Sequence, residues 1–145
     1  MDFDVDAFLA RPLTARVATN GPTVRPTWFL WEDAAFWILT GPWATLPKRV
    51  RAEPALALVV DECDLATGTT LQVIARGTAE LLPFDVPRGR RKLSRYLGPD
   101  ETAWDPWFFD YLHVDPAKKG TVWLRMSPDR LTAKDLSYTV PVKRS

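Results

Sequence analysis

The sequence predicts a mainly β fold: an antiparallel barrel with short flanking helices. Short apolar runs are separated by turn signals, and most connections between them are hairpin-like, which favours a barrel over a doubly wound sheet. Asn20-Gly21 lies between two extended runs and is the strongest short-range hairpin signal. Thirteen prolines in 145 residues further indicate many short elements separated by turns.

About seven strands are expected. The second contains Pro26, which requires a sheet edge or a bulge, and the fifth contains Gly77, which indicates a bulge or bend. The fourth is apolar throughout and is predicted to be buried on both faces, with a polar loop over 61–69 after it. A Pro128-Asp129 turn is expected to separate the last two strands. The expected ranges are 13–19, 24–31, 35–40, 55–60, 71–82, 121–126 and 130–136.

Helices are predicted over 4–10, 47–52 and 85–97. Asp4 is expected to cap the first, Pro47 suits the first turn of the second, and Gly98 ends the third. One face of the third helix is apolar and consists of Val86, Leu93, Tyr96 and Leu97. The opposite face is basic and is expected to be solvated; it consists of Arg88, Arg90, Arg91, Lys92 and Arg95. The aromatic segment from Trp104 to Tyr111 is interpreted either as a lid or wall of a substrate pocket, or as packing over the barrel end or in a dimer interface.

The length and composition limit the number of domains, the kinds of partner and the location that can be expected. At 145 residues the chain is expected to form a single domain, 1–145, with a frayed tail over 141–145. A net charge of +1 gives no basis for nucleic acid or an anionic membrane as the main partner. No run approaches the ~18 apolar residues of a membrane span. The single cysteine, Cys63, excludes an intrachain disulfide, so a reducing, cytoplasmic location is expected.

Familiar catalytic motifs do not occur in this sequence. It contains no Ser-His-Asp, Cys-His, GxGxxG or P-loop pattern, and its only histidine, His113, has no evident carboxylate or cysteine partner. One histidine and one cysteine are too few for an all-protein zinc site. No catalytic residue and no metal are therefore predicted from the residues themselves.

The order of elements resembles the pyridoxamine-phosphate oxidase-like split barrel, a family that includes FMN enzymes and deazaflavin-dependent reductases. The resemblance covers roughly 8–97 and rests on four segments: FLARPLTARVAT, VRPTWFLWEDAAFWILTG, RAEPALALVVD and LQVIARGTAEL. It implies a six- or seven-stranded split β-barrel and a homodimer. It also implies FMN or the deazaflavin coenzyme F420 at the dimer interface, the choice between them left open.

The resemblance also implies which residues contact the cofactor. The second strand would flank the ring through Arg25, Pro26, Thr27, Trp28, Phe29 and Leu30. Leu39 and Thr40 would touch the phosphate region, and Gln72 would reach across from the partner subunit. Two of these have simpler interpretations from the sequence alone: Trp28 as core packing, and Gln72 as a strand residue facing water.

The phosphate-binding segment departs from the family pattern. Members typically carry Ser-Arg-Lys or a similar triplet there, whereas the matching positions here are Ala44, Thr45 and Leu46, and a leucine cannot neutralise a phosphate. If 46–52 is helical, Arg49 shares a face with Thr45, and Lys48 with Ala44. These cations, the Thr45 hydroxyl and the helix N–H groups then offer a substitute clamp. The alternative is that Lys48, Arg49 and Arg51 form a solvated basic face on a surface helix.

Two functions follow from this resemblance. The first is a flavin- or deazaflavin-dependent oxidoreductase that transfers hydride to or from a small planar organic substrate, with the redox chemistry supplied by the cofactor. The second is a redox-inactive split-barrel module that has lost the standard phosphate clamp. Such a module would bind a flavin, another hydrophobic ligand or a partner protein.

Overall fold

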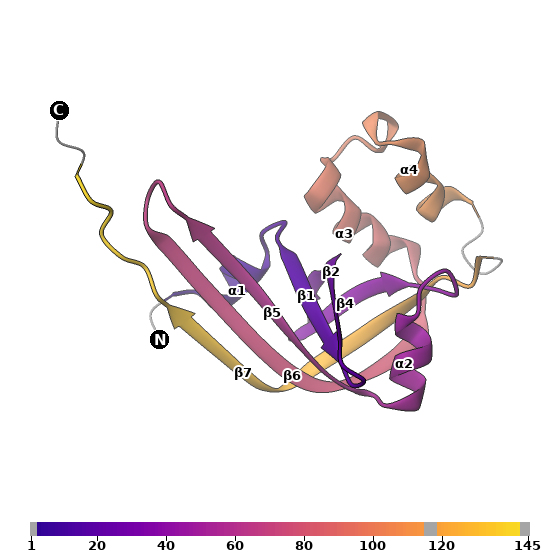
Figure 1. The fold of residues 1–145 in the computed structure, drawn as a ribbon. Helices are drawn as coiled ribbons and strands as arrows, with labels where there is room; N and C mark the ends of the chain where they lie inside the picture. Colours follow the sequence, from indigo (N-terminus) through magenta and orange to yellow (C-terminus); the bar gives the residue numbers. More distant parts are fainter. Residues whose placement is uncertain (1–2, 115–118, 143–145) are drawn as a thin grey trace.

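A computed structural model describes residues 3–114 and 119–142, in which the strands form one seven-stranded antiparallel sheet in the order β2-β1-β5-β6-β7-β4-β3. The sheet is strongly curled, with the long strands β5, β6 and β7 sweeping across the molecule (Figure 1). This confirms the predicted mainly β, antiparallel class. The strands are β1 (Thr14–Thr19), β2 (Thr23–Trp28), β3 (Leu30–Glu32), β4 (Ala35–Thr40), β5 (Ala55–Asp64), β6 (Thr69–Pro83) and β7 (Val122–Asp135).

Short helices flank the sheet. They are α1 (Val5–Leu9), α2 (Leu46–Ala52), α3 (Val86–Leu97) and α4 (Pro106–His113), with a 3-10 turn over Glu101–Ala103. The predicted cap on α1 is confirmed, since the Asp4 carboxylate accepts from the Ala7 N–H at 3.0 Å, and Gly98 ends α3 at φ 92°. Helices α3 and α4 pack together at one end of the sheet (Figure 1). No helix in the described parts of the chain combines the length and apolar character needed to cross a bilayer.

The core lies inside the curl of the sheet. Its fully buried side chains include Leu9, Val17, Phe29, Phe36, Ile38, Val60, Val73, Leu124 and Met126. The prediction that 55–60 is buried on both faces is wrong, because β5 alternates: Leu56, Leu58 and Val60 are buried, whereas the residues between them lie on the outer face. The polar loop predicted over 61–69 is also wrong, because β5 continues to Asp64 and pairs with β6 up to Thr69.

The two edge strands of the sheet, β2 and β3, are separated in sequence only by Phe29. The prediction of one strand over 24–31 is therefore wrong: the chain leaves β1 at Trp28 and joins β4 at Leu30. At this break the Tyr96 hydroxyl accepts from the Phe29 N–H at 3.0 Å and donates to the Leu13 carbonyl at 2.6 Å. A side chain thus satisfies backbone groups that have lost their strand partners. We call this junction, with the gap between β2 and β4 beside it, the seam.

The predicted bulge at Gly77 is confirmed. The register of β6 against β7 passes from Arg76–Arg130 to Gly77–Pro128, which leaves Asp129 as the extra residue. A Cβ on Gly77 would lie only 2.7 Å from the Ser127 carbonyl oxygen, so a larger residue does not fit. The predicted turn at Pro128-Asp129 is wrong for the same reason, because the bulge lets β7 run through these residues without interruption. Pro26 lies on the edge strand β2, as predicted.

The basic face of α3 is only partly solvated, contrary to prediction. The Arg88 guanidinium lies 3.6 Å from the centre of the Trp37 ring and pairs with Glu32, and Arg95 donates to the Arg11 carbonyl at 2.6 Å. Lys92 is buried, with an exposed fraction of 5%. Burial lowers the pKa of Lys92 to about 7, and the like charge of Arg95 acts in the same direction.

Removing the Tyr96 hydroxyl tests the seam. Tyr96→Phe keeps the ring but leaves the Phe29 N–H and the Leu13 carbonyl without their partner, so we expect a loss of about 2 kcal/mol in the free energy of unfolding. Urea denaturation measures it. Tyr138→Phe, at a tyrosine that is 47% exposed, is the control and should change little. Equal effects of the two substitutions would contradict the role given to Tyr96.

The buried amine of Lys92 predicts how stability depends on pH. Between pH 7 and 10.5 the unfolded chain holds a proton on this lysine that the folded chain has released, so the stability contributed at this position rises with pH. The slope approaches about 1.4 kcal/mol per pH unit. Lys92→Met removes this rise. Urea denaturation of both proteins at pH 7, 8 and 9 should show the free energy of unfolding of wild type rising relative to that of the variant. A difference between the two that stays constant with pH would refute the prediction.

Candidate functional site

A groove of about 340 Å³ lies along the seam, between β2 and the second half of β4. Strand β3 pairs only with Ala35–Trp37 of β4, and β2 is a sheet edge, so the backbone edges of β2 and residues 38–40 face each other without a strand between them. Such edges offer N–H and C=O groups to a ligand. The lining residues are Arg25, Pro26, Thr27, Ile38, Leu39, Thr40, Trp43, Ala44 and Leu46.

The loop between β4 and α2 places an aromatic ring in the groove lining. Trp43 lies directly across Gly41, where a Cβ would come within 2.3 Å of the ring, so this arrangement requires glycine. The Trp43 side chain is 52% exposed, and its ring centre is 6.0 Å from that of Tyr111 on α4. A flat, accessible aromatic surface therefore lies in the groove wall.

A cation and a hydroxyl meet at the margin of the groove. The Arg25 guanidinium donates to the Thr45 hydroxyl at 2.8 Å. Thr45 stands at the N-cap of α2 but makes no capping bond, so its hydroxyl faces Arg25 instead. Together these groups present N–H and O–H donors where the groove begins.

The other two candidate cations lie elsewhere. Lys48 is exposed on α2 and is not part of the groove lining. Arg49 packs beneath the β1–β2 turn, where a Cβ on Gly21 would lie 3.2 Å from its Nη1 atom. Its Nε atom is buried without a partner among the described residues.

The structure brings together only some of the residues that the sequence nominates. Five line the groove, namely Arg25, Pro26, Thr27, Leu39 and Thr40, and Thr45 adjoins them. Phe29 and Leu30 are 0% and 4% exposed and belong to the core. Gln72 lies on the outer face of the sheet, in register with Asp61 and Lys134.

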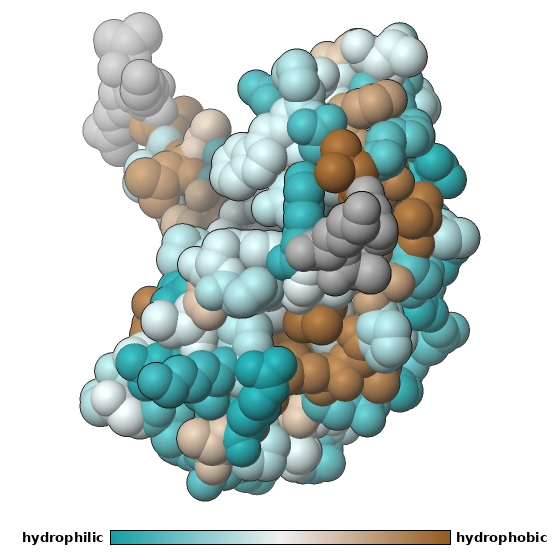
Figure 2. Space-filling view, turned by 90° about the vertical axis from the view of Figure 1, so that its right-hand side faces the viewer, coloured by the Kyte–Doolittle hydropathy of each residue, from teal (hydrophilic) through white to brown (hydrophobic). Residues whose placement is uncertain are grey.

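A second pocket of about 200 Å³ adjoins the groove and shares Thr27 and Leu39 with it. Trp28 forms part of its wall and is stacked on Tyr96, with ring centres 4.3 Å apart and planes 4° from parallel. The remaining lining residues are Lys92, Leu93, Phe108 and Tyr111. Apolar residues interrupt the otherwise hydrophilic surface on the side that carries α2, α3 and α4 (Figure 2).

The aromatic segment from Trp104 to Tyr111 divides between the two interpretations given to it. Phe108 and Tyr111 form part of a pocket wall, whereas Trp104 is buried against Leu93 and Leu112. Lys92 was missed as a site residue. Its position four residues before Tyr96, on the same side of the helix, was the available signal.

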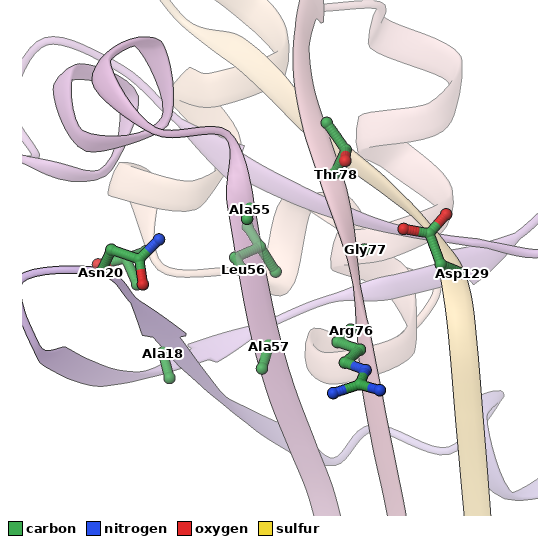
Figure 3. Close-up of a pocket in the computed structure, with 10 residues that line it drawn as sticks. Ala18, Asn20, Ala55, Leu56, Ala57, Arg76, Gly77, Thr78 and Asp129 are labelled. Carbon is green, nitrogen blue, oxygen red and sulfur yellow. The ribbon is translucent and has the colours of Figure 1, made fainter.

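A third hollow, of about 370 Å³, lies on the outer face of the sheet (Figure 3). Ala18 and Ala57 carry only small side chains there, and Arg76 and Asp129 lie at its sides (Figure 3). This face also carries Ile74, which is 40% exposed.

Solved structures share this fold at low sequence identity. A FAD-binding protein from Mesorhizobium loti is 22% identical, with a TM-score of 0.61, over 91% of this chain and 92% of that one. An F420 reductase is 24% identical, with a TM-score of 0.63, over 91% and 98%. A conserved hypothetical protein from Mycobacterium tuberculosis is 19% identical, with a TM-score of 0.68, over 93% and 86%. At these identities the likeness concerns the fold.

The sequence itself also matches a known family. No curated protein was matched by sequence. The family model described as pyridoxamine 5'-phosphate oxidase, however, matches residues 1–135, which is nearly the whole chain. The chain therefore belongs to the pyridoxamine 5'-phosphate oxidase family of split barrels.

Proposed function

We propose that this protein is an FMN- or deazaflavin-dependent oxidoreductase that transfers hydride to or from a small planar organic substrate. The observation that carries the proposal is the groove at the seam, which has a cationic margin at Arg25 and an aromatic pocket beside it. Its volume of about 340 Å³ falls within the range of roughly 300–1,000 Å³ common for small-molecule sites. Family membership and the flavin- and F420-related neighbours support this choice.

The residues present fit a phosphate despite the altered triplet. Arg25 has a planar guanidinium suited to two oxygens at once, and the Thr45 hydroxyl accepts from Arg25 while keeping its own proton to donate. Lys48, exposed on α2, and Arg49, beneath the β1–β2 turn, lie outside the groove lining, so the proposal rests on Arg25. We therefore place the phosphate at Arg25 and Thr45.

The ring would occupy the groove itself. Thr27 and Leu39 supply its walls, and the unpaired backbone edges of β2 and β4 supply donors and acceptors for its polar rim. When bound, the cofactor supplies hydride transfer. The protein holds the ring in one orientation and excludes water through Trp43 and the aromatic pocket.

We infer a homodimer formed through the outer face of the sheet. Ala18, Ala57, Val59 and Ile74 make a small, apolar centre on that face, with charged residues around it. An apolar centre with a polar rim is the usual anatomy of a protein interface. In this dimer Gln72 of each subunit would approach the cofactor of the other.

The second candidate function is a redox-inactive binding module. It is favoured by the groove chemistry: among the described residues that line the groove, Arg25 is the one cation, and Ala44 and Leu46 stand where phosphate ligands are typical. Such a module would bind a flavin or another hydrophobic ligand in the same groove without turnover. With EDTA as the electron donor for anaerobic photoreduction, reoxidation of protein-bound FMN by an added acceptor that is faster than that of free reduced FMN favours the enzyme, and no acceleration favours the module.

Affinity for FMN and for coenzyme F420 tests the phosphate assignment. We expect Arg25→Gln to weaken binding of the preferred cofactor by about 1.5–3 kcal/mol, because a charge-assisted bond to phosphate is lost. Fluorescence quenching of the ring measures the affinity. Lys48→Gln and Arg49→Gln measure what each of the other two cations adds.

Arg51→Gln is the control, since Arg51 is an exposed arginine on α2, the helix that carries Lys48 and Arg49. An Arg25→Gln affinity equal to that of Arg51→Gln would remove Arg25 from the phosphate site. If neither cofactor binds wild type, the proposed function fails.

Charge placed on the outer face tests the dimer. Ile74→Glu buries a carboxylate in the proposed interface, so we expect the dimer to dissociate at micromolar concentration. Light scattering after size exclusion measures the mass. Leu65→Glu, at the β5–β6 hairpin tip where the side chain is 73% exposed, is the control. A wild-type monomer, or a dimer unaffected by Ile74→Glu, would contradict the inferred interface.

A further inference from the structure

Lys92 is a buried amine without a counter-ion. Lys92 is 5% exposed, and no oxygen of residues 3–114 or 119–142 accepts a hydrogen bond from it; its Nζ atom is not among the fully enclosed, unpartnered atoms of these residues, so the amine reaches the pocket. Neighbouring cations on α3 do have partners, since Arg88 and Arg91 both pair with Glu32. A fully buried lysine is rare unless it is paired, because an isolated ammonium in an apolar site is costly. The fold thus retains a costly group that it does not itself neutralise.

The surroundings of Lys92 form a pocket for something flat. The pocket has a volume of about 200 Å³, and its walls include Trp28, Phe108 and Tyr111. The ring centres of Trp28 and Phe108 are 5.3 Å apart, and their planes are 18° from parallel. Trp28 is stacked between Tyr96 and Phe108, so both of its faces are covered and a bound ring would meet the edges of these side chains and Tyr111. Aromatic rings also pack edge to face, so these walls suit a planar aromatic guest, and a volume this small excludes a polymer.

We propose that this pocket binds the carboxylate of a small planar aromatic molecule, with the Lys92 ammonium as its counter-ion. Because the pocket shares Thr27 and Leu39 with the seam groove, a molecule held there lies beside the groove. Its identification as the substrate rests on the proposed function. Binding of the aromatic carboxylate does not.

The chemistry favours an aromatic carboxylate over an inorganic ion or a neutral ring. An inorganic ion would leave the aromatic walls without contacts, and a neutral ring would leave the amine without a partner. A carboxylate against a desolvated ammonium gains more Coulomb energy than the same pair in water. The pair forms only when Lys92 is protonated, so binding above neutral pH takes up a proton.

The groups around Lys92 leave it as the residue that titrates on binding. Arg95 on α3 is a like charge that opposes protonation. Burial raises the pKa of Tyr96 and of Tyr111, so both phenols stay neutral near pH 8. The described residues that β2 and β4 contribute to the pocket are Thr27, Trp28 and Leu39, which do not ionise.

The test is a calorimetric titration of the cofactor-free protein with benzoate, with benzamide as the neutral molecule of the same shape. We expect benzoate to bind at least tenfold more tightly than benzamide. Repeating the titration at pH 8 in phosphate and in Tris, which differ in ionisation enthalpy, should show that benzoate binding takes up protons. That readout in wild type does not depend on any variant folding.

Two variants complete the test. Lys92→Met keeps a long side chain without charge, and we expect it to fold, to lose the preference for benzoate and to take up no proton. Lys134→Met, at an exposed lysine on β7, is the matched control and should bind as wild type does. Benzoate affinity equal in Lys92→Met and wild type, equal affinity for benzamide, or absence of proton uptake would each overturn the proposal.

The outcome separates this inference from the proposed function. Benzoate binding by a protein that binds neither FMN nor coenzyme F420 would uphold the Lys92 pocket and refute the oxidoreductase. Cofactor binding without benzoate binding would refute the Lys92 pocket and leave the proposed cofactor site standing. Added benzoate should also quench tryptophan fluorescence in wild type, because Trp28 forms a wall of the pocket.

Discussion

The Tyr96 hydroxyl is the contact on which the geometry of the site depends. It joins the Leu13 carbonyl to the Phe29 backbone at the point where the chain crosses from one edge of the sheet to the other. Because the chain changes partners there, β2 and β4 stay apart and the groove remains between them. The same tyrosine stacks on Trp28, and Lys92 lies one helical turn before it. One side chain thus contacts both the seam and the aromatic wall.

The charges of the molecule divide into those that hold the fold and those that face a ligand. Arg88 and Arg91 hold Glu32, whose pKa they lower, and Arg90 pairs with Glu101. These pairs fasten α3 to the rest of the chain and are committed to structure. Arg25 and Lys92 differ, since the first has a hydroxyl as its partner and the second has none among the described residues. Each also lines one of the two pockets at the seam, which is why we propose that these two meet a bound anion.

Local signals in the sequence predicted local structure well. The Asp4 cap, the glycine end of α3 and the bulge at Gly77 depend on one or two residues and their neighbours, and all three are confirmed. The break at Phe29 was not predicted, because it depends on Tyr96, which is 67 residues away. The bulge was placed in β6 correctly, but its consequence for Asp129 in β7 required knowledge of the pairing.

The candidate site was predicted in the same uneven way. The expected strands over 24–31 and 35–40 were nominated from resemblance, and the structure does bring Arg25, Thr27 and Leu39 into one groove. The burial of Lys92 was missed because its neighbours on α3 are cations, which makes a solvated face the natural interpretation. Only the packing of α3 against α4 and β2 turns that position inward.

The most direct test of this account is a crystal structure of the protein with FMN bound. The account predicts the ring in the seam between β2 and β4, with its phosphate against Arg25 and Thr45 and the aromatic pocket left open beside it. FMN bound instead in the outer-face hollow around Ala18 and Ala57, or a seam that stays free of ligand at saturating FMN, would contradict it.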